Sequence, residues 1–269
     1  MLTALGTAAN SEEISQVLAP ELSSWRRDPK LAKDFVLKLA RQGHAPEVSR
    51  QVLGCLMAGG IKVDVIHFTA ALSACKRSQR WQLAMSYLGE MVQTSVIPDS
   101  ISCTLVISAC EKANQWQQAL RILCSMSELR AKPDEVSYTT VITSCQKSGL
   151  WQLAVGLLGH MSKSRLAPDL ICFNAAINAC EKSGLWHLAL SLLGDMPKSR
   201  VLPDEISYTG VISACEKNGW WQLALALLRE MPRTRLLPDA ITYNSAISAC
   251  EKGGKWWLAL DLLSKMPED

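Results

Sequence analysis

The apolar residues of this chain are spaced as in amphipathic helices, and the spacing repeats every 35 residues. Within the segment 205–239, Tyr208, Val211 and Cys215 lie three and four positions apart, which predicts a helix with one apolar face. The Asn-Gly pair that ends at Gly219 is typical of a helix C-terminus. We therefore expect one helix to end at this pair.

A second helix is predicted after the break. Ala224, Leu227, Leu228 and Met231 continue the spacing of three and four. Pro232 then interrupts the regular hydrogen bonding, because proline has no N–H to donate. Each 35-residue segment is thus predicted to be a helical hairpin.

Three residue types recur at matching positions of consecutive repeats: cysteine in the first helix, tryptophan at the start of the second, and methionine near its end. The cysteines are Cys75, Cys110, Cys145, Cys180, Cys215 and Cys250, the tryptophans are Trp81, Trp116, Trp151, Trp186, Trp221 and Trp256, and the methionines are Met91, Met126, Met161, Met196, Met231 and Met266. A fixed period of this length indicates stacked units that cannot bury their apolar faces alone. The expected fold class is an all-α solenoid, in which function belongs to a repeated surface column rather than to one pocket.

The repeat boundaries are set at the Pro-Asp pairs. The full repeats are then 65–99, 100–134, 135–169, 170–204 and 205–239, followed by a truncated repeat, 240–269. The segment 30–64 is predicted to be a degenerate repeat, with Val63-Asp64 in place of Pro-Asp, and 1–29 an N-terminal cap with a short helix. Solenoids normally carry polar caps. Because no helix follows the last apolar face, we expect the natural protein to continue.

Composition narrows the class only slightly. Apolar residues make up 48% of the chain, which argues against general disorder. A formal charge of +3 is weak evidence for a polyanion partner, so any basic groups that bind one must be concentrated on one face. The ten cysteines form no CxxC pair, so we expect no metal site and no disulfides. Buried, reduced thiols indicate a reducing compartment.

No apolar run approaches the length of a membrane span. The first twenty residues contain Glu12 and Glu13 but no lysine or arginine, which is unlike a secretory or transit peptide. Two alternatives remain open: the protein stays where it is made, or the chain is a fragment without its leader.

The sequence ITYNSAISACEKGGKWWLALDLLSKMP, together with the Pro-Asp endings of earlier repeats, resembles the pentatricopeptide repeat family in its plain 35-residue form. Tetratricopeptide repeats have a 34-residue period instead. The resemblance covers 65–269 strongly and 30–64 weakly. It implies a right-handed superhelix with the first helices on the concave side. The chain departs from the family in the tryptophan that opens each second helix, and in an arginine where the family often has glycine: Arg130, Arg165, Arg200 and Arg235.

The resemblance implies single-stranded RNA binding, with one base read by two or three side chains of each repeat. The fifth residue of each repeat would be the main base reader: Thr69, Thr104, Thr139, Asn174, Thr209 and Asn244. Its partner would be the last residue: Asp99, Asp134, Asp169, Asp204 and Asp239. The second residue would pack against base faces: Ile66, Ile101, Val136, Ile171, Ile206 and Ile241.

These residue types suit the role, although each also has a purely structural interpretation. A carboxylate only accepts hydrogen bonds, so it favours a base edge that donates, as guanine and uracil have. Alternatively, the aspartate closes the loop and caps the next helix. Both roles can hold at once.

A basic column is expected to face the phosphates: Arg77, Lys112, Lys147, Lys182, Lys217 and Lys252. The alternative is that these cations suit a helix C-terminus and pair with a preceding acid such as Glu111 or Glu216. The tryptophans could stack on bases, but their place in the outer helices favours packing between repeats.

Catalytic and cofactor motifs are absent. The four histidines share no column, and the sequence contains neither the HxE and CxxC motifs of a deaminase nor a phosphate-binding glycine loop. We therefore expect a non-catalytic RNA-binding protein without a cofactor. The alternative is a protein-interaction scaffold, since the reading positions vary little, as in a recently duplicated array.

The family's pattern assigns G to Thr with Asp, and U over C to Asn with Asp. The predicted RNA core, read parallel to the chain, is 5′-GGGUG followed by U or C. Asp34 with Asp64 in the degenerate repeat has no clear reading. By the same resemblance, the site of action is an organelle, chloroplast or mitochondrion, and the sequence identifies neither the organelle nor the transcript.

Overall fold

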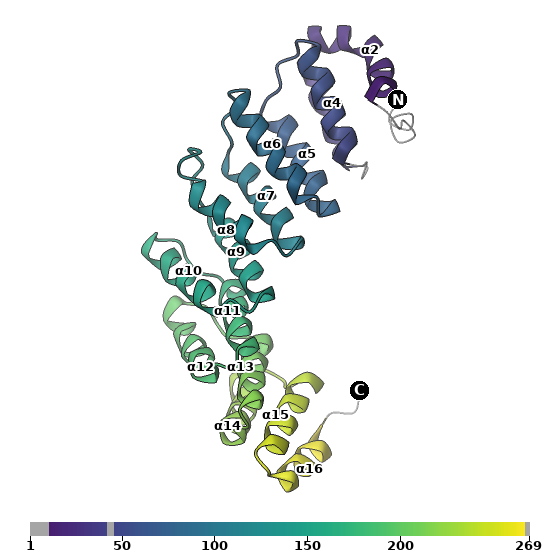
Figure 1. Ribbon diagram of the computed structural model, residues 1–269. Helices are drawn as coiled ribbons and strands as arrows, with labels where there is room; N and C mark the ends of the chain where they lie inside the picture. The colour runs from purple at the N-terminus through teal and green to yellow at the C-terminus, as the bar shows by residue number, and fades with distance from the viewer. Residues whose placement is uncertain (1–10, 42–45, 267–269) are drawn as a thin grey trace. The chain divides into compact units, whose positions relative to one another are not determined.

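The computed structural model describes residues 11–41 and 46–266, and this part of the chain is entirely α-helical apart from short 3₁₀ turns and loops (Figure 1). Residues 1–10, 42–45 and 267–269, which belong to the predicted cap, degenerate repeat and truncated repeat, lie outside the described residues. The chain forms two compact parts, 1–141 and 142–269, called here the N-terminal and C-terminal bodies. The boundary between them falls within helix α9.

The N-terminal body contains seven complete described helices and the first half of an eighth. Their bounds are α2 Ser11–Arg27, α3 Pro29–Arg41, α4 Pro46–Ala58, α5 Val65–Ser78, α6 Trp81–Gln93, α7 Ser100–Lys112 and α8 Trp116–Ser125, and α9 is Glu135–Lys147. Helix α2 packs against both α3 and α4. Its buried Trp25 lies with its ring centroid 4.9 Å from that of Phe35 on α3.

The C-terminal body repeats the same hairpin. Its helices after α9 are α10 Trp151–Lys163, α11 Leu170–Lys182, α12 Trp186–Asp195, α13 Glu205–Lys217, α14 Trp221–Glu230, α15 Ala240–Lys252 and α16 Trp256–Lys265, with 3₁₀ turns at Pro197–Ser199 and Met231–Thr234. From α7 onward, each first helix begins at the residue after a Pro-Asp pair. The predicted all-α fold of stacked helix-turn-helix repeats is confirmed. In the degenerate repeat, α3 begins at Pro29, earlier than the apolar run at Phe35 indicates, because proline is well tolerated at the first position of a helix.

In both bodies the first helices pack side by side. Helix α5 contacts α3 and α7 in the N-terminal body, and α13 contacts α11 and α15 in the C-terminal body. Helices α4, α6, α12 and α14 each pack against their own first helix and that of the next repeat, as α12 does with α11 and α13. The repeated cysteines and the methionines from Met91 to Met231 are fully buried. The first helices therefore form one continuous layer within each body.

Close packing of the first helices depends on a small residue at one position. A Cβ added to Gly210 on α13 would lie 2.7 Å from Asn178 Oδ1 and 2.9 Å from Ile177 Cγ2 on α11. Real Cβ atoms do not approach other atoms so closely, so a larger residue would force the Asn178 and Ile177 side chains, or the two helices, to shift.

The tryptophans lie between consecutive hairpins. Trp186 packs with its ring centroid 4.9 Å from that of Trp220, which belongs to the next repeat. Trp221 lies so close to Gly253 in the following repeat that no Cβ would fit there. Packing between repeats therefore accounts for these side chains without a stacked base.

The arginines that replace glycine hold a left-handed backbone conformation. Arg130, Arg165, Arg200 and Arg235 have φ between 57° and 64°. The residue after each one donates its N–H to the carbonyl of the repeated methionine, as Val201 does to Met196 at 2.9 Å. This bond is the helix-ending arrangement that glycine usually adopts at lower cost.

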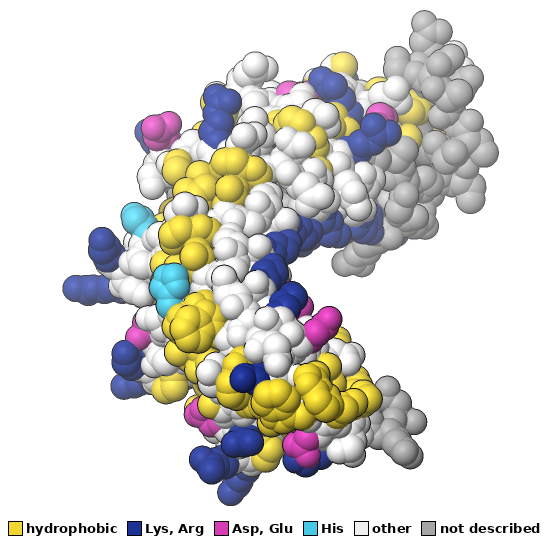
Figure 2. Space-filling view, turned by 60° about the horizontal axis from the view of Figure 1, so that its bottom comes forward, with side chains coloured by type: hydrophobic (Ala, Val, Ile, Leu, Met, Phe, Trp, Pro, Cys, Tyr) yellow, Lys and Arg dark blue, Asp and Glu magenta, His cyan; other side chains and the backbone are white. Residues whose placement is uncertain are grey.

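The last described helix exposes an apolar face. Leu263 on α16 is 58% exposed, whereas Leu228 at the same position of the preceding repeat is 6% exposed under α15. Trp256, Trp257 and Leu260 extend this surface, and apolar side chains gather near the C-terminal residues in Figure 2. None of the described helices combines the length and apolar character that crossing a membrane requires.

Candidate nucleic-acid interface

The closing aspartates of the repeats cap the helices that follow them. Asp99, Asp169 and Asp239 each have an extended backbone, and their Oδ1 atoms accept a hydrogen bond at 2.8 Å from the backbone N–H three residues later. Asp134 and Asp204 accept the equivalent bond at 2.8 and 2.9 Å. The capping role weighed in the sequence analysis is therefore real. Capping uses Oδ1 of each aspartate, and in Asp134 the second oxygen, Oδ2, accepts from Ser100 Oγ at 2.8 Å.

In repeat 170–204, the side chains of the fifth and last residues form a direct hydrogen bond. Asn174 Nδ2 donates to Asp204 Oδ1 at 3.0 Å. The two residues belong to neighbouring first helices, α11 and the start of α13, which pack side by side. Asn174 is only 9% exposed, so its amide is held in place. Helix packing thus brings together a pair that is 30 residues apart in the sequence.

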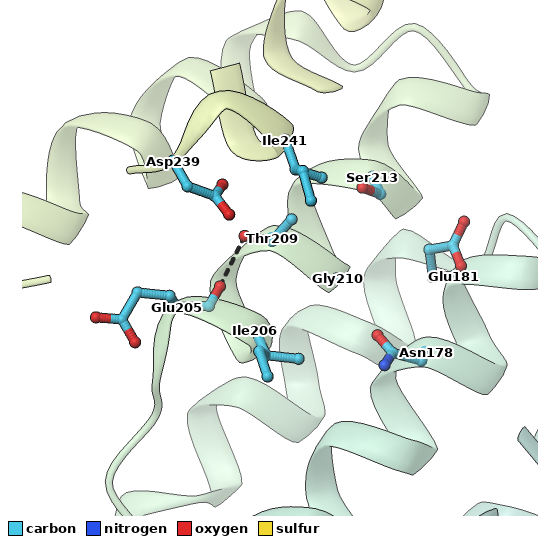
Figure 3. Close-up of a pocket in the computed structure, with 9 residues that line it drawn as sticks. All are labelled: Asn178, Glu181, Glu205, Ile206, Thr209, Gly210, Ser213, Asp239 and Ile241. Atoms are coloured by element: carbon cyan, nitrogen blue, oxygen red, sulfur yellow. Dashed lines mark hydrogen bonds between the residues drawn. The ribbon is translucent and has the colours of Figure 1, made fainter. Parts of the chain in front are cut away.

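A pocket in the C-terminal body combines all three predicted reading positions of one repeat. Its lining includes Ile206, Thr209 and Asp239, the second, fifth and last residues of repeat 205–239, together with Ile241 from the next repeat (Figure 3). Ile206 and Ile241 are 57% and 65% exposed. In Figure 3, Thr209 lies between these two aliphatic side chains, and Asp239 lies beside Ile241 with its carboxylate directed towards Thr209. Such an arrangement can hold a flat ring between apolar walls against hydrogen-bonding groups.

The exposed aliphatic walls recur along the chain. Ile101, Val136 and Ile171 are also more than half exposed, and Ile66 is 36% exposed. Single exposed apolar residues are ordinary, but equivalent residues on successive first helices form a repeated surface feature.

The threonine hydroxyls differ in their partners. Thr209 Oγ1 donates to the Glu205 carbonyl at 2.7 Å, Thr139 Oγ1 to the Glu135 carbonyl at 2.7 Å, and Thr69 Oγ1 to the Ile66 carbonyl at 3.0 Å. Thr104 Oγ1 is buried and has no hydrogen-bond partner among the described residues. Asn244 lies exposed on α15.

The basic column lies at the C-terminal ends of the first helices and takes part in contacts between repeats. Lys217 Nζ lies 2.9 Å from Glu181 Oε1, and Lys252 Nζ lies 3.0 Å from Glu216 Oε1. Lys182 Nζ donates instead to the backbone carbonyl of Lys147 at 3.0 Å; the residue before Lys147 is a glutamine rather than a glutamate. Lys217 and Lys252 thus pair with acids of the preceding repeat, whereas the sequence indicated only a neighbouring acid. The remaining members, Arg77, Lys112 and Lys147, occupy the same last turns of α5, α7 and α9.

Asp64, which closes the degenerate repeat, has a histidine partner that the described closing aspartates of the full repeats lack. Asp64 caps α5, and its Oδ1 lies 2.6 Å from Nδ1 of the buried His67. Burial alone would raise the pKa of Asp64, but hydrogen bonds from the His67 side chain and backbone outweigh burial and lower it. Asp34 lies exposed on α3.

Sequence reasoning missed the third residue of each repeat. Ser102, Ser207 and Thr242 place their hydroxyl oxygens 2.6 to 2.8 Å from the closing aspartate of the repeat before. The signal was available, since a hydroxyl residue three positions after an N-cap aspartate is typical of reciprocal capping. Asn178 and Ser213, which line the pocket of Figure 3, were also missed.

Two further kinds of site bear on the function of this chain: metal sites and reactive thiols. Among the described residues, no group of three or more His, Cys, Asp or Glu side chains is arranged to hold a metal ion. None of the ten cysteines forms a disulfide bond. Burial raises the pKa of Cys110, Cys145, Cys180 and Cys215 to about 11. These thiols stay protonated at neutral pH and behave as small apolar groups.

Several solved structures have the same fold as this chain. The crystal structure of PPR10 from maize has a TM-score of 0.56 at 19% identity, covering 98% of this chain and 43% of that chain. PPR10 in complex with an 18-nucleotide psaJ RNA element gives 0.56 at 22% identity over 98% and 42%. The PPR domain of Arabidopsis thaliana protein-only RNase P 1, in complex with tRNA, gives 0.59 at 14% identity over 67% and 95%. The chain thus spans less than half the length of the PPR10 chain.

Comparisons of sequence identify the repeats. The search of curated proteins gives no significant match. The family model described as "PPR repeat family" matches residues 98–147, 133–180, 168–217 and 206–252. The "PPR repeat" model matches 241–269, and the "Pentatricopeptide repeat domain" model matches 52–112. Together these matches span most of the chain from residue 52 onward, and the chain therefore belongs to the pentatricopeptide repeat family.

Proposed function

We propose that this protein is a non-catalytic, sequence-specific binder of single-stranded RNA that reads one base with each repeat. The observation that carries the proposal is the pocket of Figure 3, which brings Ile206, Thr209, Asp239 and Ile241 together. Two aliphatic walls accept the faces of a base, and the threonine and aspartate oxygens meet its edge. These are the side chains that the family uses for one base.

The chemistry of the reading pairs supports a preference among bases. A threonine oxygen and a carboxylate can both accept hydrogen bonds, which suits the N1–H and N2–H donors of guanine. An amide with a carboxylate offers one donor and one acceptor, which suits uracil. The proposed RNA core, read parallel to the chain, is 5′-GGGUG followed by U or C.

Two structural relatives were solved with RNA, PPR10 with a psaJ element and the PPR domain of protein-only RNase P 1 with tRNA. Their likeness supports RNA as the ligand class. We further propose that the protein acts in an organelle, chloroplast or mitochondrion, on the stability, processing or translation of transcripts.

The direct test is filter binding of the purified protein to random RNA pools, followed by sequencing of the bound fraction. The proposal expects enrichment of the G-rich core over scrambled RNA and over DNA of the same sequence. No enrichment of any RNA would contradict the proposal and favour a protein-interaction scaffold.

A further inference from the structure

A buried side chain stands three residues after each closing aspartate, at the third position of the following repeat. From the second full repeat onward these residues are Ser102, Ser137, Cys172, Ser207 and Thr242, and all five are fully buried. Four of them are hydroxyl residues. The backbone N–H of each donates to the Oδ1 of the capping aspartate, so capping alone does not require a hydroxyl side chain.

At the Asn174 site, the hydroxyl and the Asp204 carboxylate together fix how the amide is oriented. Ser207 Oγ lies 2.6 Å from Asn174 Oδ1 and 2.8 Å from Asp204 Oδ1. When Ser207 donates to Asn174 Oδ1, the amide must turn its Nδ2 towards Asp204, where it donates at 3.0 Å. The amide then keeps one further N–H to donate, and Asp204 keeps Oδ2 to accept.

This pattern distinguishes the two pyrimidines. Uracil has carbonyl acceptors on either side of N3–H, so it can accept from Asn174 and donate to Asp204. Cytosine has an acceptor at N3 and its donor at N4, so it can donate to Asp204 only when the ring is displaced from the position in which uracil N3–H meets the carboxylate. The orientation imposed by Ser207 therefore favours uracil.

At the Thr209 site, the hydroxyl of the next repeat favours a different pattern. Thr242 Oγ1 donates to Asp239 Oδ1 at 2.6 Å, and Thr209 Oγ1 lies 2.6 Å from Thr242 Oγ1. The single proton of Thr209 is used within the protein, by Thr242 or by the Glu205 carbonyl. Thr209 then offers only lone pairs to a base, as Asp239 does, and two acceptors match the two donors of guanine.

We propose that the third residue of the following repeat is a positioning residue of the base-reading site. Where its hydroxyl contacts both residues, as those of Ser207 and Thr242 do, it orients the fifth and last residues of the repeat before and thereby determines which hydrogen-bond pattern they present. The Ser137 hydroxyl instead donates to the backbone carbonyl of Asp134 at 2.8 Å. This inference rests on the proposed function and adds a further residue to the reading sites of Asn174 and Thr209.

The repeat closed by Asp169 provides a natural variant. Its third-position residue is Cys172, and a thiol is a weaker hydrogen-bond donor than a hydroxyl. Cys172 Sγ also lies 3.8 Å from Met161 Sδ. The base assigned to Asp169 should therefore be the least strictly selected of those read by full repeats with threonine.

The test compares the parent protein with Ser207→Ala, Ser207→Thr and Cys172→Ser on RNAs that differ at one base. Ser207→Ala should lower the preference for U over C at the fourth base by about threefold to tenfold, the range of one neutral hydrogen bond. Selection at the fifth base, assigned to Thr209 and Asp239, should not change. Ser207→Thr should restore the preference, and Cys172→Ser should raise selection of G at the third base by a similar factor.

The outcomes separate this inference from the proposed function. A parent protein without base preference would overturn the proposed function itself. A selective parent in which Ser207→Ala weakens all RNAs equally, or leaves the ratio of U to C unchanged, would overturn only the positioning role. Thermal unfolding of each variant identifies loss of fold, and Cys172→Ser tests the inference by gain if Ser207→Ala is unstable.

Discussion

Each closing aspartate has a structural role that needs no ligand, because it caps the helix after it. Capping by aspartate contributes about 1 kcal/mol to stability. It explains the aspartates but not the exposed aliphatic residues at the second position or the residues at the fifth. Only the combination of the three positions, as at Ile206, Thr209 and Asp239, points to a base.

Thr104 allows the structural and functional roles of a reading residue to be separated. Its buried Oγ1 has no partner among the described residues, so Thr104→Val should leave the free energy of unfolding unchanged or raise it. If the hydroxyl reads guanine, affinity for RNA with G at the second base should fall about twofold to tenfold. Chemical denaturation and filter binding measure the two effects.

Ser144→Ala is the matched control. Ser144 Oγ is also buried without a partner among the described residues, but it lies outside the reading positions. It should leave both RNA affinity and base preference unchanged. Equal RNA affinity for Thr104→Val and the parent would contradict the reading role of Thr104.

At Asp239, the third-position hydroxyl of Thr242 affects the pKa of the carboxyl group and thereby the stability of the protein at low pH. The hydrogen bond from Thr242 is the main cause that lowers the pKa of Asp239 below its ordinary value. A depressed folded-state pKa stabilises the protein above the unfolded pKa, near 4, and this stabilisation is lost as the pH falls through the folded pKa.

Thr242→Val should therefore raise the pKa of Asp239 towards its unfolded value and reduce the stability that is lost on acidification below about pH 4. Titration of the carboxyl carbon by NMR measures the pKa directly. Thr242→Ser keeps the hydroxyl and should retain the low pKa. An unchanged pKa in Thr242→Val would show that the hydroxyl does not hold the carboxylate.

At the scale of the helices, the strained arginines mark the end of each second helix. A left-handed conformation costs a non-glycine residue about 1–2 kcal/mol, and glycine loses about 0.5–1 kcal/mol more entropy on folding. Arg200→Gly should therefore be more stable than Arg200→Ala by about 1 kcal/mol.

The comparison of Gly with Ala at position 200 isolates the backbone, because both variants lose the same charge. Denaturant unfolding of the two proteins measures the difference. Equal stability would mean that the φ of 61° at Arg200 carries no strain.

Contacts between successive first helices limit how the basic column can act. Six phosphate contacts would give a slope of log affinity against log salt of about −4, at about −0.7 each. Lys252 is already paired with Glu216, so Glu216→Gln should release it for phosphate and steepen the slope by about 0.7.

Lys252→Gln serves as the control for this pair and should leave the slope close to that of the parent, because the paired lysine adds no phosphate contact. Both variants should affect all RNA sequences alike, because phosphates carry no base identity. A change in base preference, or the same slope in both variants, would mean that this column holds repeats together without meeting phosphate.

For the whole molecule, the 35-residue period was enough to predict most of the fold. The helix starts follow from the Pro-Asp pairs because the aspartate is a cap, and the buried methionines follow from the apolar spacing. Contacts between repeats were harder to predict. Ser207 with Asn174 and Lys252 with Glu216 join residues 33 and 36 apart, and their meeting depends on how two helices pack. The left-handed arginines were visible only as a departure from glycine.

The measurement that tests the central claim most directly is the change of one base by one reading residue. Thr209→Asn keeps Asp239 and the aliphatic walls of the pocket and replaces an acceptor with an amide. Selection from random RNA should then yield U in place of G at the fifth base only. The expected change in discrimination is about 1–3 kcal/mol, as for base contacts in DNA. If parent and variant select the same fifth base, the claim that this pocket reads one base of the RNA is contradicted.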